Sequence, residues 1–236
     1  MNVPVLFKSS LKSVLRDPLL LFALILPIFM TVLFRFLIPF IAGIVSHYVE
    51  LQNYYGLIQS ILLLMWPMML GWLGGFLVLD ERDEGTLQSV AVTRGGVGFH
   101  LLIRFGTILL LGLLLCLGLS PISDLYAIPF LPRLAFVFVN SLLALVYLLM
   151  LPAFASNKVE GLVVAKTFGL SMLPAFAVLL PTPYRSLGIL FPTYFLTQSV
   201  LNVDDLPKFL LYLMGGLIEI LLLTLFFSYR FSRDNR

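Results

Sequence analysis

Charged residues gather in one short stretch of this chain, "DERDEGT" at residues 80–86, although only 11% of all residues are charged. Asp80, Glu81, Asp83 and Glu84 supply four carboxylates, which could ligate a hard cation or hold basic side chains. On a continuing helix these carboxylates would point around more than half of the circumference, so convergence on one ion is disfavoured. Two interpretations stay open beside it: a solvated helix end without function, and the start of a docking element.

The residues after the acids predict a short helix over about 85–96. Gly85 can end the preceding helix, and Thr86 can cap a new one. Apolar residues then fall at i, i+3 and i+4 on one face, and a pair of glycines ends the segment. A short helix between two long ones has the form of a docking element. Its candidate docking residues are Glu81, Glu84, Gly85, Thr86, Leu87, Val90, Ala91 and Arg94.

Few other residues of this chain could do chemistry. His47 and His100 lie far apart in the sequence, and Cys116 is the single cysteine. No histidine- or cysteine-based metal site, catalytic triad or disulfide is therefore predicted. A glycine-rich phosphate loop followed by Lys-Ser or Lys-Thr is also missing from the sequence. We expect no catalytic residue, no metal site and no cofactor bound by the chain itself.

The segments that must position the acidic stretch are long and apolar. Hydrophobic residues make up 60% of the chain, against about 45–50% in soluble domains. A helix needs about 20 apolar residues to cross a membrane. We therefore predict an all-α membrane protein with six spans in one domain, 19–236. The expected spans are about 19–45, 57–79, 98–119, 133–155, 162–181 and 207–229. Prolines interrupt the apolar segment before the last span, which predicts short re-entrant or interfacial helices there.

Residues 1–18 form a separate predicted unit. Apolar residues recur there at helical spacing, and Lys8, Lys12 and Arg16 follow one another at i, i+4 and i+8. This pattern predicts an amphipathic helix that lies in the membrane interface with its cations toward anionic headgroups. The alternative is a short basic anchor that only sets the topology.

The distribution of basic residues predicts the orientation. If the N-terminus is cytoplasmic, 11 of the 15 Lys and Arg residues fall on the cytoplasmic side, as the positive-inside rule requires. Both termini and the acidic stretch are then cytoplasmic, in a multi-pass protein of the cell membrane. Nucleic acid is not an expected partner, whereas the lipid bilayer is.

Two ionisable residues fall within predicted spans, Arg35 in the first and Glu219 in the sixth. A charge at that depth costs a few kcal/mol unless it is paired, snorkels or lines water. Three interpretations are open: an intramembrane ion pair or hydrogen bond, a lining of a translocation pathway, and snorkelling toward the interface.

The segment "DERDEGTLQSVAVTRGGVGFHLLIRF" resembles a signature of the permease subunits of type-2 ABC transporters. In that family, an acidic Glu-x-x-x-Gly-Thr-Leu segment leads from the second span into the coupling helix and on to a basic residue of the third. The positions that match are Glu81, Gly85, Thr86, Leu87 and Arg104. The N-terminal helix, the six spans, the segment 155–166 and the proline-rich segment before the last span also agree. One departure is Arg94-Gly95-Gly96, where such permeases usually carry a proline.

The resemblance implies an exporter permease that works as a homo- or heterodimer around a pathway. A separate cytoplasmic ATP-binding subunit would hold ATP and Mg²⁺ and would drive the docked coupling helix. Exported substrates in such a family include drugs, peptides, lipids and polysaccharides. Two alternatives remain: a secondary transporter or channel that uses Arg35 and Glu219, and a membrane scaffold or immunity protein that transports nothing.

Overall fold

The computed structural model describes residues 18–86 and 96–234, and every regular element in these ranges is a helix. The long helices are α2 (Pro18–Val45), α3 (Tyr55–Asp83), α5 (Gly96–Leu119), α6 (Phe130–Phe154), α7 (Lys158–Gly169) and α10 (Leu206–Asp234). The short ones are η1 (Leu51–Tyr54), η2 (Leu170–Leu179), α8 (Thr182–Arg185), η3 (Ser186–Leu190) and α9 (Pro192–Leu201). Two predicted features lie outside the described residues: the N-terminal helix with Lys8, Lys12 and Arg16, and most of the coupling helix, with Leu87, Val90, Ala91 and Arg94.

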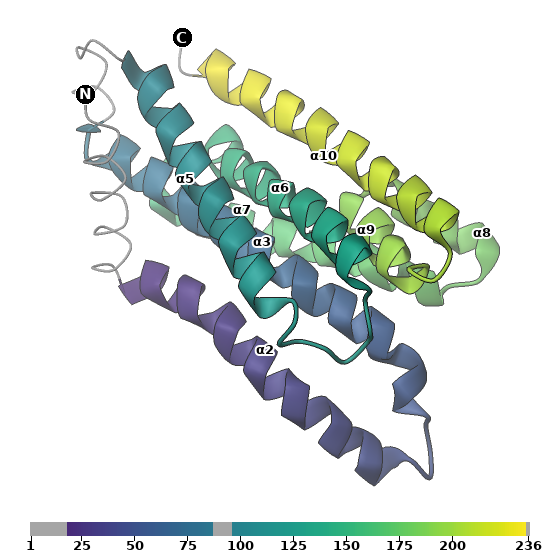
Figure 1. Ribbon diagram of the computed structural model, residues 1–236. Helices are drawn as coiled ribbons and strands as arrows, with labels where there is room; N and C mark the ends of the chain where they lie inside the picture. The colour runs from purple at the N-terminus through teal and green to yellow at the C-terminus, as the bar shows by residue number, and fades with distance from the viewer. Residues whose placement is uncertain (1–17, 87–95, 235–236) are drawn as a thin grey trace.

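Within residues 18–86 and 96–234, six helical segments are long and apolar enough to cross a membrane. The predicted all-α membrane protein with six spans is thereby confirmed, and the chain is a multi-pass protein of the cell membrane. Because the number of spans is even, α2 begins at the same end of the bundle at which α10 finishes (Figure 1). The helices α3 and α6 also end there, and α5 and α7 begin there. We call this end the basic end, since it carries Arg82, Arg104, Lys158, Arg230 and Arg233.

Helix α3 carries the acidic stretch as its last turn. The helix continues without a break to Asp83, four residues past the predicted end of the span at residue 79. Its 29 residues have a length of about 43 Å at 1.5 Å per residue. This exceeds the ~30 Å of hydrocarbon in a bilayer. The acidic turn can therefore extend beyond the apolar layer while its backbone hydrogen bonds stay intact.

The centre of the bundle is the contact between α3 and α6. Glycines of α3 allow this close approach: a Cβ atom at Gly71 would lie 2.5 Å from the carbonyl oxygen of Ala144, and one at Gly75 would lie 2.8 Å from Leu151 Cδ1. Small residues at such spacing are the usual way to pack helices in membranes, where apolar burial alone gives little driving force. The two helices form a buried pair, whereas α2 and α10 are mostly exposed.

The fifth span differs from the predicted continuous α-helix over 162–181. The α-helix α7 ends at Gly169, and the 3-10 helix η2 continues from Leu170 to Leu179. Pro174 lies inside η2. Since proline has no N–H, it cannot donate to the carbonyl four residues earlier, and the change in helix type begins at that residue, Leu170.

The segment between the fifth and sixth spans turns back into the bundle. Helix α8 lies at the end opposite the basic end, and α9 lies deeper in the bundle (Figure 1). The start of α9 reaches the junction of α7 and η2, because the Thr193 hydroxyl donates to the Ser171 carbonyl at 2.8 Å. Helix α9 is mostly buried, and a short turn joins it to α10, so the two helices run antiparallel.

Candidate functional site

The candidate site is built on the last turn of α3. Glu81 forms an ion pair with Arg104 of α5, and the two side chains are only 13% and 6% exposed. A charged group is expensive to bury near the membrane unless an opposite charge lies beside it. The pair therefore holds the end of α3 against the beginning of α5, the two helices that flank the predicted coupling segment.

Asp80 and Asp83 hold the turn between α6 and α7. The Lys158 ammonium donates to Asp80 Oδ2 at 3.0 Å, and the Lys158 backbone N–H donates to Asp83 Oδ2 at 3.0 Å. A side-chain bond and a main-chain bond thus converge on one residue, the first of α7. These two contacts connect the acidic turn to the fifth span.

The first turn of α7 is fixed locally as well. Asn157 caps the helix, since its Oδ1 accepts from the Glu160 N–H at 2.9 Å, while Glu160 Oε2 accepts from the Ser156 N–H at 2.7 Å. This arrangement resembles a capping box, except that Glu160 accepts from the N–H one residue before the cap. Gly161 brings the helix close to α3: a Cβ there would lie 2.5 Å from Leu79 Cδ1. The α6–α7 turn is consequently packed tightly against α3.

Arginines connect the same region to α10. Arg82 donates to the Ala155 carbonyl at 3.0 Å and lies 5.6 Å from the centre of the Phe231 ring. Arg230 of α10 donates to the Ala153 carbonyl at 2.8 Å, with its guanidinium 4.3 Å from the Phe154 ring centre. Both arginines thus bond carbonyl groups at the end of α6.

We call these contacts the basic-end network. Its members are Asp80, Glu81, Arg82, Asp83, Arg104, Lys158 and Arg230. The network connects α3, α5, the α6–α7 turn and α10. A displacement at the end of α3 would therefore reach several spans at once.

Glu84 and Gly85 are not members of this network. Gly85 has a φ of +67°, in the left-handed region that favours glycine, and a Cβ there would meet no atom within 4 Å. Glu84 is exposed, and no hydrogen bond or ion pair of its side chain with a described residue is seen. The acidic stretch thus divides into three acids held by the chain itself and one that is free to contact another molecule. Thr86 beside it is exposed too.

A cation site is not supported by this geometry. In residues 18–86 and 96–234, no group of three or more His, Cys, Asp or Glu side chains is placed to hold a metal ion. Asp80, Glu81 and Asp83 each turn to a different partner atom, so their oxygens do not converge.

The intramembrane residues Arg35 and Glu219 are not brought together within the chain. Arg35 of α2 donates to the Ile122 carbonyl in the α5–α6 loop at 2.5 Å. Glu219 lies near the middle of α10, and its Oε2 is buried without a hydrogen-bond partner among the described residues. Helices α2 and α10 lie on opposite sides of the bundle (Figure 1), so the two side chains can meet only through other molecules.

Sequence reasoning missed two features of this region. Lys158 was not recognised as the partner of Asp80 and Asp83, although Asn157 and Glu160, spaced as in a capping box, mark a helix start beside it. The pair Gly71 and Gly75, in a Gly-x-x-x-Gly spacing within the second span, is a sequence signal for close helix packing.

Comparison with known proteins places the chain in a family. The family model described as "Fluoroquinolones export permease protein Rv2686c-like" matches residues 10–227. Two curated relatives, the fluoroquinolones export permease proteins Rv2686c and MT2760 from two strains of Mycobacterium tuberculosis, are each 25% identical over 217 residues. The match covers 89% of this chain and 86% of each relative. No solved structure matches. The resemblance to ABC exporter permeases is thus confirmed, and the chain belongs to the Rv2686c-like family of fluoroquinolone export permeases.

Proposed function

We propose that this chain is the membrane subunit of an ATP-driven ABC exporter and that the basic end faces the cytoplasm. A separate ATP-binding subunit would supply ATP and Mg²⁺, while the chain itself has no ATPase activity and binds no cofactor. The orientation rests on the excess of Lys and Arg at the basic end. Because both relatives are named as fluoroquinolone exporters, we propose amphiphilic drugs of this kind as substrates.

One observation carries this proposal: the acidic stretch is divided between three acids that bind within the chain and one exposed acid. Asp80, Glu81 and Asp83 bind the chain's own α5 and α7, whereas Glu84 is exposed beside the left-handed Gly85. An ATP-binding subunit that contacts the segment after Gly85 would pull on α3, and the basic-end network would pass the displacement to α5, α7 and α10. We propose that the candidate coupling residues contact the ATP-binding subunit. We propose the interfacial N-terminal helix as a second contact with that subunit.

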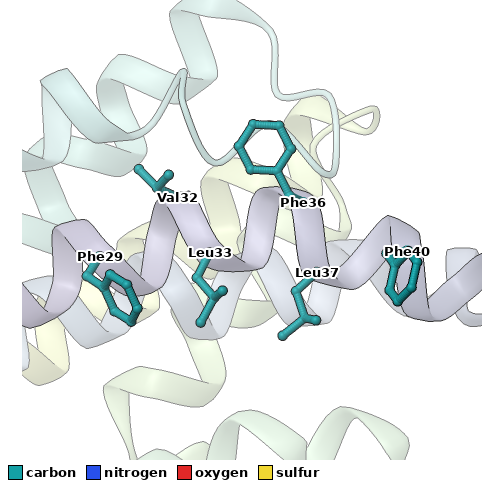
Figure 2. Close-up of a pocket in the computed structure, with 6 residues that line it drawn as sticks. All are labelled: Phe29, Val32, Leu33, Phe36, Leu37 and Phe40. Carbon is teal, nitrogen blue, oxygen red and sulfur yellow. The ribbon is translucent and has the colours of Figure 1, made fainter.

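The exporter is proposed to act as a dimer of permease chains. Helix α2 exposes an apolar hollow of about 520 Å³ lined by Phe29, Val32, Leu33, Phe36, Leu37 and Phe40. Figure 2 shows Phe29, Leu33 and Leu37 along one side of the helix, with Val32 and Phe36 on another. We propose that this face receives a second permease chain. Cross-linking between two chains that carry Phe36→Cys in a Cys116→Ser background tests this dimer contact. Phe130→Cys, at another exposed position, is the control. Equal cross-linking of the two cysteine variants would argue that α2 contacts lipid alone.

The coupling proposal is tested by charge reversal at Glu84. The full chain is co-expressed with its ATP-binding subunit, and inside-out vesicles are assayed for ATP-dependent uptake of norfloxacin. Glu84→Arg should lower uptake and co-purification of the ATP-binding subunit at unchanged permease abundance. Glu50→Arg, at an exposed acid of the opposite end, is the matched control. Absence of ATP-dependent uptake by the wild-type complex would refute fluoroquinolone export, and normal co-purification of Glu84→Arg would refute docking at this residue.

A further inference from the structure

A small cavity lies where the start of α9 meets α6, α7 and α10. Its volume is about 100 Å³, and residues from all four helices and from η2 line it. Those that matter here are Tyr147, Ser171, Thr193, Phe168, Phe191 and Phe227. Three aromatic rings and a tyrosine therefore surround one enclosed space in the middle of the bundle.

The cavity shares one lining residue with a larger hollow. Phe191 also lines a hollow of about 430 Å³ along η2 and η3, and its side chain is 39% exposed. Drug-sized ligands occupy sites of about 300–1,000 Å³. The enclosed cavity can receive one ring or short substituent, while the hollow outside Phe191 can receive the rest of a larger molecule.

The wall of the cavity offers a hydrogen-bond donor. The hydroxyls of Tyr147 and Ser171 lie 2.7 Å apart and share one hydrogen bond. Two hydroxyl protons are present in this pair and only one is used in the shared bond. Whichever residue donates, one O–H has no further acceptor among the described residues.

A carboxylate lies one helical turn along α10 from the lining of this cavity. Glu219 precedes Leu223 and Phe227, both of which line the cavity, by four and eight residues, so the three share one face of α10. Helix α9 runs antiparallel to α10, and a Cβ at Gly215 would lie 2.7 Å from the Phe195 ring. Glu219 follows Gly215 by one turn, so in sequence it lies between this contact with α9 and the cavity-lining Leu223.

The charge of Glu219 is not matched within the described part of the chain. The residue is half-buried, and its Oε2 is buried without a hydrogen-bond partner there. A carboxylate at this depth costs several kcal/mol unless a partner compensates it. The surrounding aromatic rings add favourable faces for a cation, so a positively charged ligand is the complementary one.

We propose that Glu219 and this cavity form a binding site for lipophilic aromatic amines. The protonated amine pairs with Glu219, one ring or substituent enters the cavity, and an acceptor atom of the ligand takes the spare O–H of Tyr147 or Ser171. The inference rests on the proposed export function and names the chemistry of its substrate. In this proposal a single permease chain recognises the drug, and Arg35 does not contribute to the binding site.

The experiment compares two ligands that differ in one charge. Norfloxacin carries a protonated piperazine amine at neutral pH, and N-acetylnorfloxacin lacks that charge. Binding of both is measured by equilibrium dialysis with the full-length permease and its ATP-binding subunit in lipid nanodiscs. Wild type should prefer norfloxacin. Glu219→Gln should weaken norfloxacin binding about tenfold, or about 1.4 kcal/mol, and leave N-acetylnorfloxacin unchanged, whereas Glu219→Asp should keep the preference.

Two further variants test the cavity and the specificity of the charge. Leu223→Phe narrows the cavity and should weaken both ligands together. Asp205→Asn, which removes an acid at the opposite end, should change neither. Equal wild-type affinity for the two ligands, or an unchanged preference in Glu219→Gln, would overturn the proposal. If Leu223→Phe displaces a bound lipid and leaves both drug affinities unaltered, the cavity binds an acyl chain and the proposed amine site is refuted.

The failure of this site and the failure of the proposed function are distinguishable. Binding is measured without ATP, whereas export requires ATP hydrolysis. Charge-selective binding without ATP-dependent uptake would support the site and refute the export proposal. ATP-dependent uptake that is unaffected by Glu219→Gln would refute the site and leave the export proposal standing.

Discussion

The Glu81 carboxylate and the Arg104 guanidinium pair at the basic end with both side chains almost fully buried. The Nε and Nη1 atoms of Arg104 have no hydrogen-bond partner among the described residues. The charge of the arginine is therefore compensated by its pair with Glu81 and by the nearby Asp80. Because Glu81 belongs to the same turn as the exposed Glu84, the anchoring contact and the proposed docking contact lie within one turn of α3.

The first prediction concerns the energetics of this pair. Removing one partner of a buried ion pair leaves an uncompensated charge and costs about 3–5 kcal/mol, whereas removing both costs much less. Arg104→Leu and Glu81→Leu should each lower the thermal stability of the purified permease strongly, and the double variant should recover most of the loss. Lys208→Ala, which breaks the exposed Lys208–Asp205 pair, should have little effect. Additive losses in the double variant would contradict this account.

The second prediction concerns the contact between Lys158 and Asp80. Lys158→Glu places a third acid beside Asp80 and Asp83 and should reduce drug transported per ATP hydrolysed. The exchange Asp80→Lys with Lys158→Asp restores opposite charges and should recover part of the coupling. Lys166→Glu makes the same charge change at an exposed position of α7 and serves as the control. If the exchange variant transports no better than Lys158→Glu, the contact does not transmit coupling.

The third prediction isolates backbone conformation at Gly85. A Cβ at this position meets no atom of the described residues within 4 Å, whereas the φ of +67° is unfavourable for other residues. Gly85→Ala should cost about 1–2 kcal/mol in this conformation. Gly85→Asn should be tolerated better, since asparagine enters the left-handed region more readily. The measure is the ratio of transport to ATP hydrolysis; equal effects of the two substitutions would exclude a left-handed requirement.

The sequence predicted the features that depend on the pattern of neighbouring residues. The six apolar segments and the charge bias follow from the sequence pattern, and a helix break at Gly85 follows from the residue type, whereas its left-handed φ is known only from the structure. Contacts between residues far apart in the sequence could not be predicted in this way. The contact of Asp80 with Lys158 joins residues 78 positions apart, and only the packing of α3 against α7 brings them together. The same holds for the contact of Gly215 with Phe195 of α9, which depends on how the proline-rich segment turns back.

The fifth span marks another limit of sequence reasoning. Its mean hydropathy suits a continuous helix, but Pro174 changes the backbone from α to 3-10 geometry. Hydropathy reports burial in the membrane and says nothing about helix type. The change matters for function because it places Ser171 beside Tyr147 and Thr193, at the wall of the proposed binding site.

The last prediction concerns the glycine contact at the centre of the bundle. A methyl group at Gly71 would lie 2.5 Å from the Ala144 carbonyl oxygen and 2.6 Å from Tyr147 Cβ. Neither atom belongs to a flexible side-chain end, so α3 and α6 would have to separate. Gly71→Ala should therefore lower thermal stability although alanine is the better helix former. Gly106→Ala, in α5 with no atom within 4 Å of its Cβ, should be neutral or stabilising. Because Tyr147 also lines the cavity, norfloxacin binding should weaken in Gly71→Ala, and a stable variant with unchanged binding would show that α3 and α6 do not pack this closely.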